Sequence, residues 1–585
     1  MAGERRAVRS KSHLNSLPER RAVYFRPPAT RGLLLAAWCL LLTIFCSAQT
    51  RPPGHAADVH SQRGLAAVQK GQWQQAISEF QLALKLKPAS ASLHNSLGFA
   101  LMQTGRYDAA LIEFRRATAL DPNLAEAYFN AGKVLEYKQD LDGSIESYQN
   151  ALRRRPDWAD AHDALGVILG HRGNYLGAKS EFEAALKSNP ADGEAHYHLG
   201  LAEWYGPDHS AAITEFQEAV RLRPDDANAH YYLGLAYQDR GMTELALAEF
   251  QAATRLDPAN AQFHNGLGSA FQRDGDLVDA AAEFRRALEI KPNDADAENN
   301  LGLALLSQGD GDGAIQALEA AVKLDPQHTE ARNNLGLAFL QKAQWEDAIR
   351  EYHDLINLDP NDADAYYNLG VALKQKEDFD QAILALRQAI ALDPSLPEPR
   401  YTLGVIFWQQ GKLDEAAVEF RAAIKNRPDY EQAHSILGSV LRQKGDLETA
   451  EEELRTALRL DPSDGGAHQS LGMVYRQKHD TARAQEEFQK AEDLNKAKMN
   501  LQAATLATNT GARQLRQGDV DGSIQKFRSA LSLSPDFAPA HYELALALRQ
   551  KGDVVQASAE FKKASELDSH LKPPPMPAAT GSGKP

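Results

Sequence analysis

The chain has 585 residues, of which 43% are apolar and 24% are charged. This balance is typical of a folded soluble protein and argues against a largely disordered one. The formal net charge is −15, but eight Lys and Arg against two Glu give residues 1–48 a net charge of +6, which leaves −21 on the remainder. A body this acidic repels a phosphate backbone, so nucleic-acid binding is excluded from the leading hypotheses.

The basic start leads into an apolar run, Leu33 to Cys46, whose length fits the hydrophobic region of a secretory signal. Small residues at Cys46 and Ala48 fit cleavage after Ala48, so residues 1–48 are predicted to be a signal peptide of bacterial type. The alternative is a retained signal anchor in the inner membrane, because residues 32–50 are uncharged and just long enough to span it. Both alternatives place the body outside the cytoplasm, in the periplasm or cell envelope.

Cysteine occurs only in this segment, at Cys39 and Cys46. The exported body is therefore expected to have no disulfide, no thiolate metal site and no cysteine nucleophile. Residues 49–56 are predicted to be a linker to the rest of the chain.

Glycine and proline recur along the body with a fixed period of 34 residues. The glycines stand at positions 64, 98, 132, 166, 200, 234, 268, 302, 336, 370, 404, 438 and 472. The prolines stand at positions 88, 122, 156, 190, 224, 258, 292, 326, 360, 394, 428 and 462. After Gly472 the phase slips by five residues, to Gly511 and then Ala545. The body therefore consists of fifteen units of one repeat.

Each unit is predicted to be a helix, a turn and a second helix, if the recurring glycine is numbered position 8. Positions 4, 7, 8 and 11 are mostly apolar, aromatic or small, which is helical spacing. A glycine at position 15, such as Gly275, can adopt the left-handed conformation that ends a helix. The second helix has small residues at positions 20 and 27 around a large one at position 24, as in Ala280, Phe284 and Ala287. The proline at position 32 cannot continue that helix.

The residues Leu267, Gly268, Ala280, Phe284, Ala287 and Pro292, repeated every 34 residues, resemble the tetratricopeptide repeat (TPR). The resemblance implies an all-α fold, a right-handed superhelix (α-solenoid) of antiparallel helix pairs. It also implies that the first helices line a concave groove that binds peptides or proteins. Thirteen repeats are predicted in residues 57–498 and two more in residues 504–571. Residues 572–585 are rich in Pro and Gly and are predicted to be a disordered tail.

The five extra residues, 499–503, lie in a stretch without a helix breaker. No Gly or Pro occurs from Thr481 to Thr510, so the second helix of repeat thirteen is expected to continue as one long or bent helix. The last two repeats are expected to be rotated relative to the first thirteen.

Histidine stands at position 4 in nine repeats, which raises the question of a metal site. Equivalent atoms of stacked helices lie about 10 Å apart, whereas zinc needs nitrogens about 2.0–2.1 Å from one ion. We therefore expect packed, hydrogen-bonded rings and no metal or cofactor. No catalytic motif occurs, and the repeats leave little room for a dense catalytic constellation, so the chain is predicted not to be an enzyme.

Helical geometry places positions 2, 5, 6, 9, 12 and 13 of the first helix on one stripe, which faces the groove in TPR proteins. This stripe carries asparagines in the middle repeats: Asn130, Asn299, Asn300, Asn333, Asn334 and Asn368. A carboxamide both donates and accepts, so it can pair with a peptide bond of any sequence. The run is partly similar to the asparagine ladder in the TPR region of O-GlcNAc transferases. The alternative is that these amides only bond adjacent helices.

Two further sets of side chains are expected on the stripe. The aromatic set offers interface anchors with polar tips; it comprises Tyr197, Trp204, Tyr205, Tyr231, Tyr367, Tyr401 and Trp408. The cationic set would favour an acidic peptide or an anionic glycan; it comprises Lys374, Arg442, Arg476, Arg516 and Arg549. The alternatives are aromatics half-buried between repeats and cations paired with nearby carboxylates.

The leading hypothesis is a non-enzymatic scaffold of the bacterial envelope that binds protein or peptide ligands in its groove. The alternative is an accessory subunit of a glycosyltransferase or polysaccharide-export system, motivated by the asparagines and the cationic set. The sequence does not name the partner.

Overall fold

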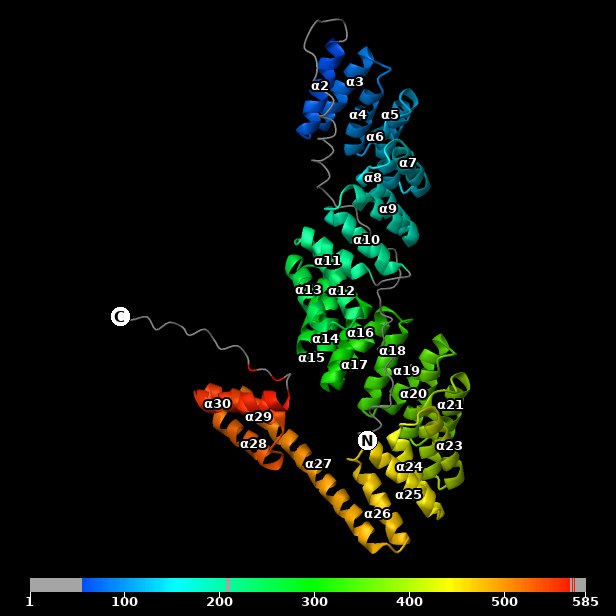
Figure 1. Cartoon of the computed structure of the whole chain (residues 1–585), viewed down its shortest axis with the longest axis vertical. Helices are drawn as coiled ribbons and strands as arrows, with labels where there is room; N and C mark the ends of the chain where they lie inside the picture. Colours follow the sequence, from blue (N-terminus) through cyan, green and yellow to red (C-terminus); the bar gives the residue numbers. More distant parts are fainter. Residues whose placement is uncertain (1–54, 207–210, 569–570, 572, 574–585) are drawn as a thin grey trace, which may run out of the picture. The chain divides into compact units, whose positions relative to one another are not determined.

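The computed structural model describes residues 55–206, 211–568, 571 and 573. These residues form twenty-nine helices, and none of them is in a strand (Figure 1). The described chain divides between Lys342 and Ala343 into two compact units. We call residues 55–342 the N-terminal unit and residues 343–573 the C-terminal unit.

The N-terminal unit alternates the first and second helices of successive repeats. Its first helices are α2 (His55–Gln69), α4 (Ala91–Gln103), α6 (Ala125–Tyr137), α8 (Ala159–His171), α10 (Gly193–Tyr205), α12 (Ala227–Asp239), α14 (Ala261–Asp274), α16 (Ala295–Gln308) and α18 (Thr329–Gln341). Its second helices are α3 (Trp73–Leu86), α5 (Tyr107–Leu120), α7 (Leu141–Arg154), α9 (Tyr175–Ser188), α11 (Ala212–Leu222), α13 (Thr243–Leu256), α15 (Leu277–Ile290) and α17 (Gly311–Leu324).

The C-terminal unit continues the same alternation from a second helix. Its second helices are α19 (Trp345–Leu358), α21 (Phe379–Leu392), α23 (Leu413–Asn426), α25 (Leu447–Leu460), α28 (Val520–Leu533) and α30 (Val554–Leu567). Its first helices are α20 (Ala363–Gln375), α22 (Pro397–Gln409), α24 (Glu431–Lys444), α26 (Gly465–Gln477) and α29 (Ala538–Lys551). The remaining helix, α27 (Thr481–Arg516), has both roles.

A close contact between the recurring glycine and a large side chain sets the distance between the two helices of each repeat. A Cβ atom built on Gly268 would lie 2.7 Å from the Phe284 ring and 3.1 Å from the backbone oxygen of Ala280. Gly268 and Ala280 therefore lie in contact where the two helices of this repeat pack together. Since no larger residue fits at position 8 without a shift, the glycine allows the two backbones to approach closely.

The turn between the two helices requires a left-handed residue at position 15. Gly275 has φ +91°, and it ends α14 as the sequence predicts. Four repeats place another residue in the same conformation: Gln139, Ala343, Glu377 and His479, with φ of 59–66°. A residue with a Cβ atom is strained in the left-handed conformation. These four residues therefore adopt a backbone conformation that their residue types disfavour.

The phase slip after Gly472 lies within one uninterrupted helix, as expected. Helix α27 has 36 residues. Its first half packs Phe488 against Gly472 and serves as the second helix of repeat thirteen. Its second half packs Gly511 against Phe527 and serves as the first helix of repeat fourteen. With α27 counted twice, the described helices make up the fifteen repeats.

Within the described residues, no helix combines the length and apolarity needed to cross a membrane. The predicted signal or anchor (residues 1–48 or 32–50) and most of the predicted linker (residues 49–56) lie outside those residues, as does nearly all of the predicted tail (residues 572–585).

The strained turns give a first prediction. Replacing Glu377, which is exposed, with Gly should raise the free energy of unfolding by about 0.5–1 kcal/mol, because relief of left-handed strain exceeds the added chain entropy of Gly. The reverse change, Gly275→Ala, should lower it by about 1 kcal/mol. Urea denaturation followed by circular dichroism measures both, and a Glu377→Gly chain less stable than the parent contradicts this account.

Candidate functional site

The first helices form a continuous surface within each unit. Besides packing on its own second helix, a first helix contacts the next first helix, as α8 does with α10, α10 with α12 and α20 with α22. No pair of second helices shows contacts to the same extent. The first helices therefore lie on the inner side of the bend in the stack. We call the surface formed by their positions 2, 5, 6, 9, 12 and 13 the first-helix face.

Hydrogen bonds between neighbouring repeats run along this face. The residue at position 6 of one repeat bonds to position 5 of the repeat before it, 35 residues earlier. The pairs are Asn130 to Asn95 (3.1 Å), His198 to Asp163 (2.8 Å), Asn300 to Asn265 (3.1 Å) and Asn334 to Asn299 (2.9 Å). In each asparagine pair the Nδ2 group of the later residue donates to the Oδ1 atom of the earlier one.

Burial separates the predicted asparagines into two groups. Asn299, Asn333, Asn334 and Asn368 are buried, whereas Asn130 and Asn300 are half-buried. The four buried amides expose little surface, and the bond from Asn334 to Asn299 agrees with the alternative that these amides join adjacent helices. The physical reason is that positions 6 and 5 of successive repeats face one another, so an amide can donate to the amide of its neighbour. Peptide binding by these asparagines stays a prediction.

The aromatic residues of α10 and α12 form one cluster in the N-terminal unit. Trp204 and Tyr231 are buried in it, while Tyr197, Tyr205 and Tyr232 are half-buried at its edge. The ring centres of Tyr197 and Tyr232 lie 6.0 Å apart, and the hydroxyls of Tyr205 and Tyr232 are 3.3 Å apart. Burial raises the pKa of Tyr197, Tyr231 and Tyr232 well above the usual range. These phenols therefore stay protonated and can donate hydrogen bonds.

In the C-terminal unit, the predicted aromatic residues are buried or contact other side chains. Tyr367 is buried. Tyr401 is half-buried and lies 5.0 Å from Tyr430 between ring centres. Trp408 is also half-buried and donates from Nε1 to Oε1 of Gln443 at 3.2 Å.

The predicted cations do not form a uniform basic stripe. Lys374 is buried, and Arg442 is half-buried with its Nε atom lacking a hydrogen-bond partner. The guanidinium groups of Arg476 and Arg549 lie over the rings of Phe488 and Phe561, at 5.7 and 5.6 Å. Arg516 is exposed. Two of the five, Arg476 and Arg516, are exposed, and whether the cationic set is a binding surface stays a prediction.

A partly desolvated group of charges adjoins the aromatic cluster, and sequence reasoning did not single it out. Burial lowers the pKa of Lys133, which opposing carboxylates including Asp160 only partly restore. Burial also raises the pKa of Glu136 and of Glu194. Burial opposes the protonation of His198, but the Asp163 carboxylate outweighs it and raises the pKa of that histidine. The group contains Asp163, His198 and Lys133, at positions 5, 6 and 9 of successive repeats. Because these positions share the first-helix face, the repeat numbering could have indicated the group from the sequence.

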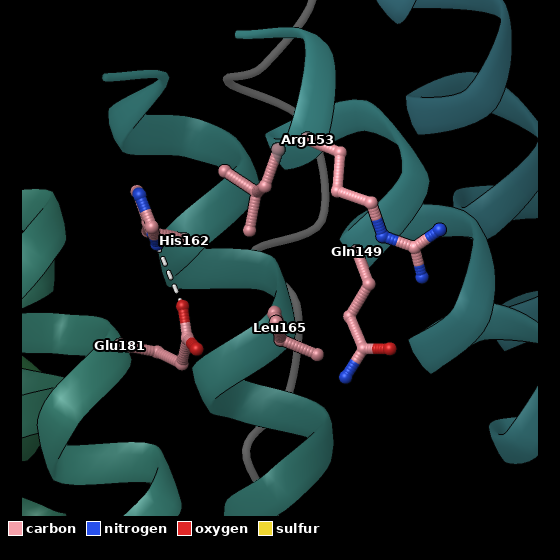
Figure 2. Close-up of a pocket in the computed structure, with 6 residues that line it drawn as sticks. Gln149, Arg153, His162, Leu165 and Glu181 are labelled. Carbon is pink, nitrogen blue, oxygen red and sulfur yellow. Dashed lines mark hydrogen bonds and ion pairs between the residues drawn. The ribbon is translucent and has the colours of Figure 1, made fainter. Parts of the chain in front are cut away.

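The nine position-4 histidines each form the same clamp, which confirms that they are packed and hydrogen-bonded. Nδ1 lies 2.5–2.7 Å from the Glu at position 23 of the same repeat, as in His162 with Glu181 (Figure 2). In eight of them Nε2 lies 2.9–3.2 Å from the carbonyl oxygen of the Pro at position 32 of the preceding repeat. The clamp thus joins both helices of a repeat to its neighbour.

In the clamps of His162, His230 and His434 the surroundings favour a charged imidazole. A carbonyl oxygen only accepts, so Nε2 must donate, and a neutral ring would then turn the Nδ1 lone pair toward a carboxylate. Protonation of both nitrogens removes this conflict. Accordingly, the hydrogen bond to glutamate raises the pKa of His162, His230 and His434, against the effect of burial. Gln149, Leu152, Arg153 and Leu165 complete the shallow depression beside the His162 clamp (Figure 2).

The clamps do not gather ligands around one point. His196 bonds to Glu215 and His198 to Asp163, so the two rings point to different partners, as expected. In the part of the chain that the structure describes, no three His, Cys, Asp or Glu residues are placed to hold a metal ion. The chemistry that the first-helix face offers is therefore binding through aromatic edges and hydrogen bonds.

Family models match nearly the whole described chain. Tetratricopeptide repeat models match residues 61–125, 125–157, 164–227, 199–248, 231–295 and 514–570. The model of the TPR-containing C-terminal domain of cilia and flagella-associated protein 70 matches residues 279–507. The chain is a tetratricopeptide repeat protein. Its fold is an all-α solenoid of TPR units, as the sequence predicts, and this fold generally serves as a non-catalytic scaffold for interactions between proteins.

Solved TPR structures resemble parts of this TPR protein. YrrB, described as a TPR protein with an unusual peptide-binding site, is 27% identical over 32% of this chain and 95% of its own, with a TM-score of 0.28. MamA from Desulfovibrio magneticus RS-1 is 25% identical over 29% of this chain and 96% of its own, with a TM-score of 0.28. The APC/C hetero-tetramer Cut9-Hcn1 is 16% identical over 88% and 99%, with a TM-score of 0.36. No curated protein sequence matches this TPR protein.

The asparagine pairs give a prediction that separates a packing role from a binding role. Replacing Asn334 with Ala leaves the buried Oδ1 atom of Asn299 without its donor and should lower the free energy of unfolding by about 1–3 kcal/mol. The matched change Asn300→Ala should cost less, because water can reach half-buried Asn265. Urea denaturation compares them. If Asn334 served only to bind a ligand, its replacement would leave the stability unchanged.

The clamps predict a pH-dependent stability of this TPR protein. Because the folded pKa of His162, His230 and His434 lies above the unfolded value of 6.5, their stabilisation is complete below pH 6.5 and is lost as the pH rises through the folded values. Urea midpoints should therefore fall from about pH 6 to about pH 8.5. The triple His→Gln variant at these positions should show a flatter profile, whereas His353→Gln, at an exposed site, should keep the parental slope. A triple variant with the parental slope would contradict the clamp.

Proposed function

We propose that this TPR protein is a non-enzymatic scaffold of the bacterial cell envelope that binds an extended segment of a partner protein along its first-helix face. The repeats support the scaffold role, and the basic start followed by the apolar run Leu33 to Cys46 supports export. Whether that segment is removed or retained as an inner-membrane anchor does not change the surface that the body presents.

The observation that carries this proposal is the edge of the aromatic cluster. Tyr197, Tyr205 and Tyr232 come from neighbouring first helices, lie on the same face and keep part of their surface in solvent. Tyrosines of this kind bind a partner at a low entropic cost, because a large ring with few rotatable bonds is already held in place. The ligand that fits is a peptide segment with an apolar or aromatic side chain for the rings and polar groups for the hydroxyls.

The titratable groups with shifted pKa values support binding over catalysis. His162, His230 and His434 are held in clamps between repeats, and His198 is held by Asp163. An acid, base or nucleophile would have to leave these bonds before it could act on a substrate. The same groups instead fix the positions of the first helices, which a binding surface needs.

The accessory-subunit alternative depends on the asparagines and the cationic set. In the structure most of these side chains are buried or packed on aromatic rings, so they offer little to an anionic glycan. The aromatic edge, by contrast, is accessible and fits a peptide, and the scaffold function is therefore the better supported of the two.

Peptide selection tests the proposal. Peptides selected from a random displayed library on the full chain should bind it, and Tyr205→Ala should weaken a selected peptide by at least about tenfold, as expected for loss of an aromatic anchor. Tyr107→Ala is the matched control, because Tyr107 is a half-buried tyrosine at the start of a second helix and stacks on Tyr137. Fluorescence anisotropy measures both affinities. Equal affinities for the two variants would reject the aromatic edge as the binding site.

A further inference from the structure

Helix α27 interrupts the stacking that every other junction between repeats maintains. Elsewhere a turn folds the next first helix back onto the preceding second helix, and the two pack side by side, as α9 packs on α10. In α27 the second helix of repeat thirteen and the first helix of repeat fourteen are collinear. Both halves therefore lack the neighbour that the repeat pattern provides.

The first half shows this loss at position 24. In thirteen repeats the large residue there is fully buried: Phe80, Phe114, Tyr148, Phe182, Phe216, Phe250, Phe284, Leu318, Tyr352, Leu386, Phe420, Leu454 and Phe527. The next first helix provides the cover, as His198 does for Phe182 at 5.5 Å between ring centres. Phe488 is only half-buried, although the Arg476 guanidinium lies over its ring.

The second half of α27 lacks its covering helix at position 3 of repeat fourteen. Most repeats have a buried alanine there, sealed by the preceding second helix: Ala127, Ala161, Ala195, Ala229, Ala297, Ala331, Ala365, Ala433 and Ala467. Repeat fourteen has Leu506 at this position, and 70% of its surface is exposed. A large apolar side chain thus stands where the fold normally buries a small one.

The two uncovered surfaces lie on one side of α27. Phe488, Asn495, Gln502 and Asn509 are spaced by seven residues, and Glu492, Met499, Leu506 and Arg513 follow each of them by four. This is the spacing of a stripe through which two long helices pair. Met499, at its centre, is 69% exposed. We call these eight residues the α27 stripe.

Phe488 and Leu506 cannot cover each other. They are 18 residues apart on the same helix, which separates them by about 27 Å. A second α27 helix in antiparallel orientation can cover both, because it brings its Leu506 level with Phe488 and its Phe488 level with Leu506. The arrangement restores the antiparallel pairing of second and first helices that the other junctions have.

The charges of α27 favour the antiparallel orientation. Residues 481–494 contain Arg483 and Lys490 against four acidic residues, a net charge of −2. Residues 495–516 contain Lys496, Lys498, Arg513 and Arg516 and no acidic residue, a net charge of +4. An antiparallel pair sets each acidic half beside a basic half, whereas a parallel pair would set like charges together.

Arg513 argues for a second α27 over an ordinary second helix. At its position, position 10, other repeats have a small or branched apolar residue that the preceding repeat buries, such as Ala270, Ala338 or Val440. Arg513 would place a charge against the apolar surface of an ordinary second helix. This charge does suit the net-negative first half of α27, beside which the antiparallel pair sets Arg513.

We propose that two copies of this chain dimerise through the α27 stripe, with the two helices antiparallel about a two-fold axis near residue 497, so that Met499 of each copy lies level with Asn495 of the other. Each copy supplies the cover that the other copy lacks at Phe488 and at Leu506. The interface is isologous, so every contact occurs twice and the assembly closes as a dimer.

Sedimentation velocity on the full chain tests the proposal. The parent should sediment as a dimer at micromolar concentrations. Leu506→Glu places a carboxylate opposite the acidic half of the second helix, twice per dimer, and should raise the dimer dissociation constant by at least about tenfold. Leu501→Glu is the matched control, since Leu501 is 45% exposed on the same helix but lies outside the stripe, and it should dimerise like the parent. Circular dichroism checks that both variants are folded.

A cross-link locates the interface independently of affinity. In a chain with Cys39 and Cys46 changed to Ser, Met499→Cys should be joined to its counterpart in the second copy by a bifunctional thiol reagent with a spacer of about 10 Å, because residue 499 lies two positions from the two-fold axis. Leu501→Cys should not. A monomeric parent at all concentrations would overturn the proposal, and so would a dimer that Leu506→Glu leaves intact or that Met499→Cys fails to cross-link. Binding of another occupant to α27 would appear as a monomeric parent.

Discussion

The close contact between a glycine of the first helix and a large side chain of the second is the constraint on which the rest of the structure depends. In the repeat of Gly268 and Phe284 a single added methyl group would overlap the ring, so the two helices are locked at one distance. The outer side of such a ring is covered by the next first helix, as His198 of α10 covers Phe182. A single repeat therefore leaves apolar surface uncovered, and its stability depends on packing against its neighbours. The uncovered Phe488 in α27 shows what remains when the next helix does not return.

Two kinds of polar contact hold the stack, and they respond differently to conditions. The clamps of His162, His230 and His434 carry a charge that depends on pH, whereas the amide pairs, such as Asn334 with Asn299, do not titrate. The clamps occupy repeats one, two and four to seven, and again twelve, thirteen and fifteen. Repeats eight to eleven have no histidine at position 4, and buried amides are concentrated at their start. Among the clamps, the hydrogen bond to glutamate raises the pKa of His162, His230 and His434, so a rise in pH weakens the contacts of repeats four, six and twelve.

Much of the fold could be predicted from the sequence because the period fixes it. The glycine every 34 residues predicted the helix pairs. The absence of Gly and Pro from Thr481 to Thr510 predicted the continuous helix α27. The candidate site was harder, since spacing tells which face a residue occupies but not how deep it lies. Asn300 and Asn334 have the same position, yet one is half-buried and the other buried. The clamp had a readable signal: repeats with His at position 4 have Glu at position 23, whereas Tyr128 and Tyr366 are accompanied by Ser147 and Ala385.

The location of binding chemistry on the first helices follows from the same constraints. Second helices must keep position 24 large and positions 20 and 27 small, and the clamp fixes position 23 in most repeats, so few of their buried positions are free to vary. On the first helices, positions 5, 6 and 9 supply neither partner of the contact between glycine and ring, although their side chains can pack on the ring, as Tyr197 and Tyr232 do on Phe216 at 6.2 and 5.8 Å between ring centres. Tyr197, Tyr232 and Lys133 occupy such positions, where the residue type varies from repeat to repeat. Specificity can therefore vary along this face while the period, and with it the fold, stays constant.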